Sequence, residues 1–201
     1  MDRSDLKELH YIAPIDNAPS IVEHGIFSNR RATSLAHTSV AMPEIQDRRA
    51  AVVVPRGKRL HEYVNLYFCA RNPMLFKRKD MCNQLCVLAV SLEVLDLPGV
   101  VITDGNAAGD YVRFAPSPEG LAIVNREWTF AEYWTDEDKI AYFRKKAAKC
   151  AEVLVPDRID PRFLRGAYVA SLGPKNMLDS LGTGLMVYID SHMYFGTEGT
   201  P

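Results

Sequence analysis

Lys149-Cys150-Ala151-Glu152-Val153-Leu154-Val155 combines a clear strand pattern with a carboxylate. The stretch is apolar, β-branched towards its end and followed by Pro156, a pattern that predicts a strand. Glu152 lies in the middle of it, and a carboxylate in a buried strand is strongly destabilising unless a partner binds it or a cavity opens beside it. Two interpretations follow. Either this is an edge strand whose glutamate faces water or a nearby lysine, which is the commoner case, or the glutamate is held rigidly and points into a cleft.

Length and composition allow one soluble domain of ordinary size. The chain has 201 residues, of which 47% are hydrophobic and 24% charged. No internal repeat or linker divides it, so we expect a single domain over residues 1–201. The formal net charge is −1, which excludes a globally basic nucleic-acid-binding protein and leaves only a local basic patch as a binding surface.

The four cysteines, Cys69, Cys82, Cys86 and Cys150, are not spaced as a disulfide framework, and no signal peptide precedes them. No apolar run approaches the length that spans a membrane. We therefore expect a cytoplasmic protein with no membrane contact. Cys82 and Cys86 have no second Cys or His pair at zinc spacing, so no metal site is expected.

Apolar and β-branched runs alternate along the chain with capped helical segments and turns. Strands are expected at 10–15, 52–54, 62–68, 85–92, 100–103, 166–170 and 184–190, and helices at 17–24, 43–49, 72–76, 160–165 and 174–181, with two more helical stretches in 117–148. Residues 28–42 are expected to form a long irregular loop and residues 103–110 a turn-rich one. The glycines match neither the dinucleotide fingerprint nor the P-loop, so a nucleotide would be bound by another device.

Four segments in a fixed order resemble a known family. They are Tyr11-Ile12-Ala13 followed by Asp16-Asn17, Ile45-Gln46-Asp47-Arg48-Arg49, Glu62-Tyr63-Val64-Asn65-Leu66-Tyr67-Phe68-Cys69 with Asn72-Pro73-Met74-Leu75, and Ala151-Glu152-Val153-Leu154-Val155. Together they resemble the DarT family of bacterial DNA ADP-ribosyltransferase toxins, and the resemblance covers nearly the whole chain.

The resemblance implies an α+β, single-domain ADP-ribosyltransferase-like fold, in which two packed, mostly antiparallel sheets with flanking helices enclose an NAD cleft. It also implies transfer of ADP-ribose from NAD, without a metal, onto a base of single-stranded DNA, with thymine as the expected base. The protein would be the toxin of a toxin–antitoxin pair, and a DarG-like macrodomain antitoxin would reverse the modification. We expect it to act as a monomer.

The resemblance also assigns residues. Glu152 matches the catalytic glutamate of the family, and Arg49 the active arginine, which also contacts NAD. Further NAD contacts are implied at Tyr11, Ile12, Ala13, Ser20 and Ser28. The sequence departs from the family in two places: the first-strand motif is typically His-Ile-Thr, and a histidine often lies where this chain has Tyr111.

The chemistry of ADP-ribosyl transfer suits these residue types. Cleavage of the N-glycosidic bond of NAD passes through an oxocarbenium-like transition state, which a fixed carboxylate stabilises. An arginine can hold a diphosphate bidentately or polarise the attacking base, and both roles remain open for Arg49. Arg48 and Arg49 point about 100° apart on a helix, so they cannot share one role.

Single-stranded DNA requires stacking surfaces beside positive charge. Tyr142 and Phe143 followed by Arg144, Lys145 and Lys146 offer both, just ahead of Glu152. A second candidate patch comprises Arg56, Lys58 and Arg59 beside Tyr63. The alternative for either charge run is an ordinary solvated face.

Two other functions compete with DNA modification. One is an ADP-ribosyltransferase-fold enzyme that acts on RNA or protein. The other is a catalytically silent nucleotide-binding module on the same fold, against which the combination of Glu152 and Arg49 argues.

Overall fold

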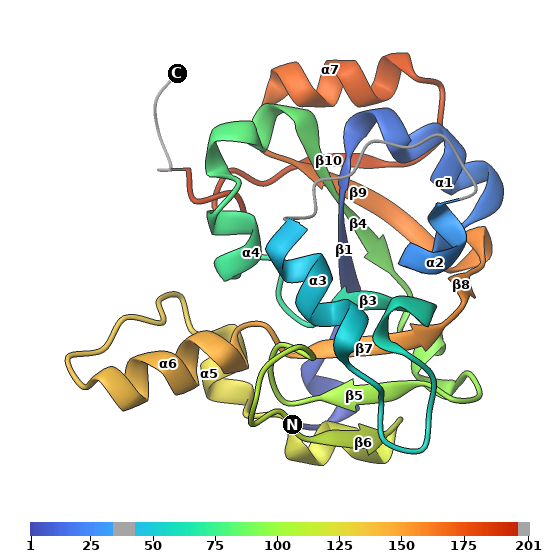
Figure 1. Cartoon of the computed structure of the whole chain (residues 1–201). Coiled ribbons are helices and arrows are strands. Elements are labelled where there is room, and N and C mark those ends of the chain that lie inside the picture. The colour runs from blue at the N-terminus through green and yellow to red at the C-terminus, as the bar shows by residue number, and fades with distance from the viewer. Residues whose placement is uncertain (34–42, 197–201) are drawn as a thin grey trace.

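A long bent sheet with helices around it forms the body of the protein (Figure 1). The computed structural model describes residues 1–33 and 43–196. The strands are β1 Leu9–Pro14, β2 Ile26–Phe27, β3 Tyr63–Tyr67, β4 Leu85–Val90, β5 Val101–Thr103, β6 Phe114–Pro116, β7 Glu152–Pro156, β8 Arg158–Ile159, β9 Leu164–Val169 and β10 Val187–Ile189. The α-helices are α1 Ala18–His24, α2 Asn29–Ala32, α3 Pro43–Ala51, α4 Pro73–Phe76, α5 Arg126–Phe130, α6 Lys139–Ala148 and α7 Leu172–Ser180. The fold class is α+β, as expected.

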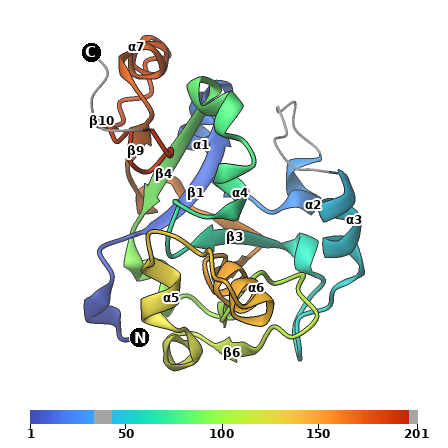
Figure 2. The ribbon, with the colours of Figure 1, turned by 90° about the vertical axis from the view of Figure 1, so that its left-hand side faces the viewer.

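The expectation of two packed sheets is corrected in one respect. The main strands form one sheet of eight in the order β10-β9-β4-β1-β3-β7-β5-β6, and β2 pairs with β8 in a separate small sheet. β1 pairs with β4 along its whole length but meets β3 only at His10 and Tyr67. Because so little backbone pairing joins them, the two halves of the sheet diverge there, and β3 crosses the direction of β1 (Figure 2). The two expected sheets are thus two halves of one sheet.

The strand that contains Glu152 is interior, not at an edge. β7 pairs with β3 on one side and β5 on the other, and Val153, Leu154 and Val155 are fully buried. It begins at Glu152, since residues 149–151 form the turn that leads into it. The interpretation of this stretch as an edge strand with a solvated glutamate is therefore wrong.

Most of the other expected elements are confirmed with small shifts in their bounds. The run predicted at 85–92 is β4, which is buried throughout and lies between β1 and β9. Helix α1 ends at Gly25, as predicted, where φ is +87° and a Cβ would lie 2.1 Å from the carbonyl oxygen of Ile159. Only glycine fits this helix end, and the close approach joins α1 to the strand β8.

Two expectations differ from the structure, and three short strands were not predicted. Residues 52–54 form a single bridge from Val53 to Arg59 in place of a strand. The expected loop at 28–42 contains the short helix α2, while residues 34–42 lie outside the described part of the chain. The strands β2, β6 and β8 are two or three residues long, too short for an alternating pattern to predict them.

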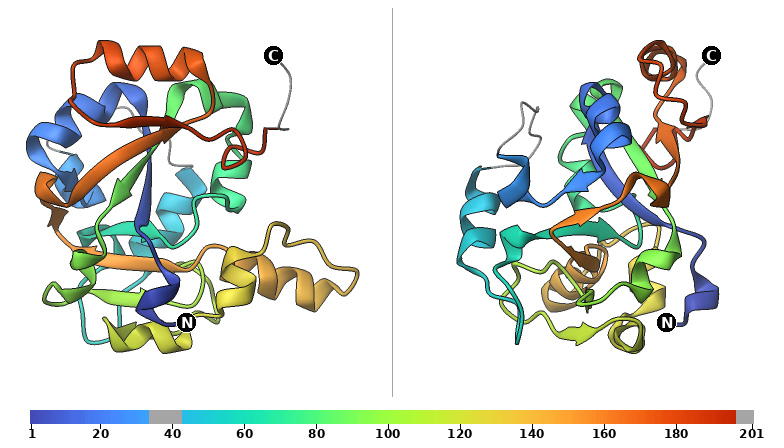
Figure 3. Two further views of the ribbon diagram at one scale, coloured as in Figure 1. Left: turned by 180° about the vertical axis from the view of Figure 1, so that it is seen from behind. Right: turned by 90° about the vertical axis from the view of Figure 1, so that its right-hand side faces the viewer.

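The helices lie on several sides of the sheet. In Figures 1 and 3, α7 lies beyond the end of the molecule that holds β9 and β10, while α6 projects from the opposite half beside α5. Apolar side chains of α1 and α7, such as Ile21 and Leu178, join the main core with those of β4 and β7. Within the described residues, none of the helices combines the length and apolar character that crossing a bilayer requires.

Candidate active site

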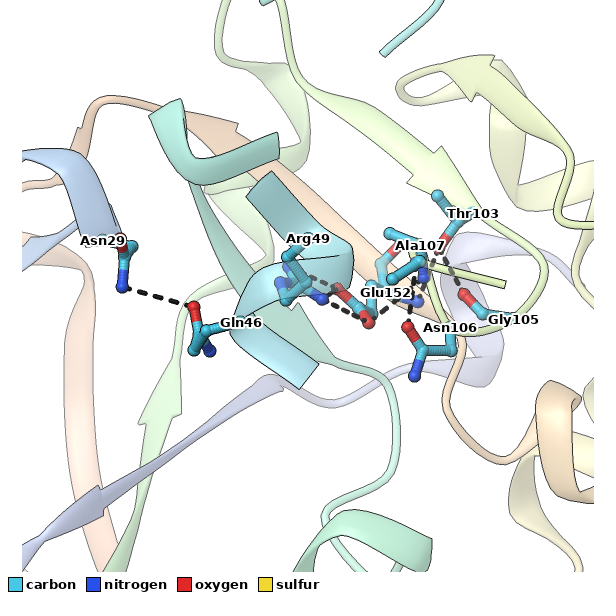
Figure 4. A network of polar contacts seen from close by, with 9 residues as sticks. Asn29, Gln46, Arg49, Thr103, Gly105, Asn106, Ala107 and Glu152 are labelled. Carbon is cyan, nitrogen blue, oxygen red and sulfur yellow. Dashed lines mark hydrogen bonds and ion pairs between the residues drawn. The ribbon is translucent and has the colours of Figure 1, made fainter. Parts of the chain in front are cut away.

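A buried ion pair joins Glu152 and Arg49. Glu152 opens β7 directly opposite Tyr67 of β3, and it is 1% exposed. Arg49 lies in the last turn of α3 and is 7% exposed. Its Nη1 lies 3.3 and 3.2 Å from the two carboxylate oxygens, and its Nη2 lies 3.2 Å from Oε2 (Figure 4). A charged residue on this strand is tolerated because the guanidinium neutralises it.

The surroundings of Arg49 favour its charged form. Burial alone would lower the pKa of Arg49, but the charge and hydrogen bonds of Glu152, together with Tyr67, outweigh burial and raise it. Tyr67, on the neighbouring strand, has its pKa raised by burial and by the Glu152 charge, so it remains a neutral phenol. The site therefore holds one anion, one cation and one neutral hydroxyl side by side.

The loop after β5 supports Glu152 from the other side. The backbone N–H of Ala107 donates to Oε1 of Glu152 over 3.3 Å. Thr103 is buried and links the loop to β7. Its hydroxyl donates to the carbonyl of Gly105 at 2.7 Å and accepts from the N–H of Glu152 at 3.1 Å. These bonds fix the loop relative to β7, so the carboxylate has a defined position before any substrate binds.

Arg48 and Arg49 diverge, as expected from helical geometry. Arg48 is exposed while Arg49 is buried against Glu152. Both contribute to the wall of a cleft, but only Arg49 reaches the carboxylate.

The cleft beside this pair has a volume of about 520 Å³. Its walls come from β1, β3, α3, α4 and α6 and from the loop after β5. Five cationic residues line it: Arg48, Arg49, Lys77, Arg78 and Lys146. Among the described residues that line it there is no carboxylate, because Glu152 lies behind Arg49. A nearly neutral chain thus has a strongly basic cleft, which suits a phosphate-containing ligand.

The residues expected to contact NAD do not all reach this cleft. Tyr11 and Ile12 of β1 line it, and burial raises the pKa of the Tyr11 phenol to about 12. Ala13 is buried in the main core. Ser20, on α1, is half-buried away from the cleft wall, and Ser28 is buried at the start of α2 with no hydrogen-bond partner for its hydroxyl in the described part of the chain. NAD contacts by all five residues remain predictions.

Helix α6 forms one wall of the cleft, but only part of the predicted DNA patch faces inwards. Lys146 lines the cleft, together with Phe143, which is 64% exposed. Tyr142 supports Lys146, with 3.3 Å between the hydroxyl oxygen and Nζ. Lys145 pairs with Asp136 at 2.7 Å, and Arg144 is exposed outside the wall.

The second basic patch does not face the cleft. Lys58 pairs with Asp157 at 2.6 Å, and Arg56 and Arg59 lie on an exposed turn. In the described residues, the cleft wall includes Tyr63 but none of these three cations.

Two anchors hold α6 and its connection to α5 against the body. The buried Lys149 donates from Nζ to the carbonyl of Ala131 at 2.7 Å. Trp134 packs edge-on against Phe76 of α4 and Phe195 near the C-terminus, with ring centroids 5.6 and 6.0 Å away. The wall that contains Phe143 and Lys146 is therefore positioned by packing.

Sequence reasoning missed several residues that the fold brings to the cleft. Tyr67, Lys77, Arg78 and Asn106 were not assigned to any site, whereas Phe143 was expected as a stacking surface for DNA. Tyr67 lies four residues after Tyr63 on a predicted strand, and this spacing puts both on one face of the sheet. No comparable signal marks Asn106, which sits in a loop whose path the sequence does not determine. The described residues include no group of three or more His, Cys, Asp or Glu that could hold a metal ion.

Comparison with known proteins now identifies the family. The profile described as "ssDNA thymidine ADP-ribosyltransferase, DarT" matches residues 10–195. A DNA ADP-ribosyl transferase–DNA ADP-ribosyl glycohydrolase fusion protein of Thermosipho africanus is 34% identical over 177 residues, which are 82% of this chain and 42% of that protein. A DNA ADP-ribosyl transferase of Thermus sp. strain 2.9 is 32% identical over 158 residues, 73% of each chain.

The fold agrees with these sequence matches. The structure of Thermus sp. 2.9 DarT in complex with ADP-ribosylated single-stranded DNA superposes with a TM-score of 0.79 at 25% identity, covering 96% of this chain and 99% of that one. The match extends across both halves of the bent sheet, because nearly the whole chain is covered. This chain therefore belongs to the DarT family of single-stranded DNA thymidine ADP-ribosyltransferases.

Proposed function

We propose that the protein transfers ADP-ribose from NAD onto thymidine bases of single-stranded DNA. The observation that carries this proposal is the buried Arg49–Glu152 pair at a cleft lined by five cationic residues, in a chain of the DarT family. NAD is a dinucleotide diphosphate, and DNA supplies further phosphates. Both therefore suit a cleft with cationic walls.

Glu152 supplies the negative charge for the bond-breaking step. Its carboxylate faces the positive charge that develops on the ribose as the bond to nicotinamide lengthens, and nicotinamide leaves as a neutral base. Because β7 and the loop after β5 fix the carboxylate, little reorganisation is needed during the reaction.

Arg49 must release Glu152 for this to happen. Among the described residues Arg49 lines the cleft while Glu152, paired with it, does not, so a ribose in the cleft reaches Glu152 only when Arg49 moves. The displaced guanidinium then remains within the cleft, where a diphosphate or a carbonyl oxygen of the base can receive its hydrogen bonds. The reaction thus requires that the bound substrate separates Arg49 from Glu152.

The acceptor base must be unstacked to enter the cleft. A base in a duplex is already stacked and paired, whereas a base in a single strand can reach Phe143 on the exposed side of α6. Lys146, one turn further along the same helix, supplies a cation for the adjoining phosphate.

Substitutions on α6 test this wall. We expect Phe143→Ala and Lys146→Ala each to raise the KM for a single-stranded oligonucleotide about tenfold, and Lys146→Ala to reduce the salt dependence of binding. Arg144→Ala is the matched control, because Arg144 lies outside the cleft wall on the same helix. The measurement is the initial rate of labelling at several salt concentrations, and an equal effect of all three substitutions would contradict the assignment.

The acceptor class is tested with labelled NAD. We expect the protein to label single-stranded DNA, with little label on the matching duplex, RNA or protein. Label confined to RNA or protein would support the competing ADP-ribosyltransferase reading, and nucleotide binding without any transfer would support a silent module.

The partner we propose is a DarG-like macrodomain antitoxin that removes the modification. The Thermosipho africanus relative, a fusion of DNA ADP-ribosyl transferase and DNA ADP-ribosyl glycohydrolase, supports this pairing. The chain spans less than half of that fusion, so the antitoxin activity would come from a separate protein or segment. We also propose that the toxin acts as a monomer, since the Arg49–Glu152 pair and the cleft walls are built from one chain.

A further inference from the structure

We infer that Asn106 selects the acceptor base, by donating a hydrogen bond to a carbonyl oxygen beside the ring nitrogen that is modified. This inference rests on the proposed function and adds a specificity-determining residue to it. Asn106 belongs to the loop after β5 and lines the cleft.

The side-chain amide of Asn106 has a fixed orientation. Its Oδ1 accepts a hydrogen bond of 2.9 Å from the backbone N–H of Ala108, so the oxygen is already engaged within the loop. The amide nitrogen is left without an acceptor in the described part of the chain, on a half-buried side chain in the cleft wall. Asn106 therefore presents its amide donor to the cleft, while its oxygen is held by the loop.

The same loop holds this donor beside the reacting centre. Ala107, the next residue, donates its N–H to Oε1 of Glu152, so the loop that contains Asn106 contacts this carboxylate directly (Figure 4). The hydrogen bond from Thr103 to Gly105 fixes the other side of the turn. Because Glu152 faces the ribose carbon that is attacked, a group beside Glu152 lies close to the attacking base.

The chemistry of thymine matches a donor at this position. Thymine is joined to deoxyribose through N1, so N3 is its ring nitrogen available for attack, and two carbonyl oxygens, O2 and O4, flank it. As the bond from N3 to the ribose carbon forms, the bond from that carbon to nicotinamide breaks, its electron pair leaves with nicotinamide, and the N3 proton is released to water. Negative charge develops on O2 and O4 as N3 loses its proton, and the Asn106 donor, facing O4, stabilises it.

Cytosine presents a different pattern to the same donor. It has an amino group where thymine has O4, so an amide donor facing that position would meet another donor. The site would thus favour thymine without contacting its methyl group. Asn106 thus distinguishes the two bases by the hydrogen-bond donor of its side chain, and not by restricting the size of the cleft.

The decisive variant is Asn106→Ser. A serine hydroxyl can accept the hydrogen bond from the N–H of Ala108, which preserves the turn, but it cannot supply the amide donor in the cleft. We expect Asn106→Ser to lower kcat/KM for a thymidine oligonucleotide about 10- to 100-fold, as for a lost hydrogen bond to a charged group, while the KM for NAD stays within about twofold. Asn106→Asp, which replaces the donor by an acceptor, is expected to be worse.

Modified oligonucleotides make the test specific. The wild-type protein and Asn106→Ser are assayed on single-stranded DNA in which the target is thymidine, 2-thiothymidine or 4-thiothymidine, since sulfur is a poorer hydrogen-bond acceptor than oxygen. We expect the wild type to discriminate against 4-thiothymidine and the serine variant to lose that discrimination. This role of Asn106 is overturned if Asn106→Ser labels thymidine as well as the wild type does, or if it keeps the same discrimination against both analogues. A wild-type protein that labels no thymidine oligonucleotide would instead refute the proposed function.

Discussion

Replacing Glu152 by glutamine is expected to lower the rate of ADP-ribosyl transfer by about 10³-fold. Glutamine keeps the size of the side chain and can still accept from the N–H of Ala107, but it removes the charge that stabilises the oxocarbenium-like transition state. The measurement is the single-turnover rate of labelling of a single-stranded thymidine oligonucleotide. A rate within tenfold of the wild type would mean that the carboxylate is not the catalytic group.

The same substitution also disturbs the fold, because Glu152 is the counter-charge of Arg49. Losing one partner of a buried ion pair costs about 3–5 kcal/mol, which lowers Tm by roughly 10 °C in a domain of this size. The double variant Glu152→Gln/Arg49→Gln separates the two effects. We expect it to recover most of the lost stability while remaining inactive, since amides at both positions leave no buried charge.

Replacing Arg49 by alanine is expected to reduce transfer at least about 100-fold and to lower Tm by roughly 10 °C. The first effect follows from the loss of a group that binds phosphate or base, and the second from leaving the Glu152 carboxylate buried without a counter-charge. Arg49→Lys is expected to be nearly as inactive, because one ammonium cannot replace a planar fork of donors. Rates and melting curves of the same preparations give both quantities.

Arg48→Ala is the matched control for this prediction. Arg48 precedes Arg49 on the same helix but is exposed and does not reach the carboxylate. We expect its activity to fall only a few-fold and its Tm to stay within about 2 °C of the wild type. Equal losses of activity from the two alanine variants would contradict the assignment of Arg49.

Local chemistry identified the centre of the site but not its surroundings. Glu152 was recognisable because a carboxylate on an apolar strand needs an explanation. Its burial between β3 and β5 excludes a solvated edge strand, although among the described residues Arg49, and not Glu152, lines the cleft. Arg49 lies 103 residues away in the sequence, so its contact with Glu152 could be expected only from the family resemblance. The same holds for Ala107, whose backbone N–H has no side-chain signature at all.

The shape of the sheet shows a second limit of sequence reasoning. Apolar runs predicted β3, β4 and β7, because these strands are buried and bounded by turns. No residue pattern could indicate that β1 would meet β3 at one pair and so join both halves into one bent sheet. On α6, the run from Tyr142 to Lys146 was recognised as basic and aromatic. Which of its side chains enter the cleft depends on the anchoring of that helix by Lys149 and Trp134.

The most direct measurement of the central claim is the intact mass of a single-stranded oligonucleotide with one thymidine, after incubation with the protein and NAD. We expect a gain of one ADP-ribose per oligonucleotide and the release of one nicotinamide. We expect no gain on an oligonucleotide in which that thymidine is replaced by deoxycytidine, and none with Glu152→Gln over the same period. ADP-ribose attached to the thymidine-free oligonucleotide, or nicotinamide release without any change in DNA mass, would contradict the proposed thymidine-specific transfer.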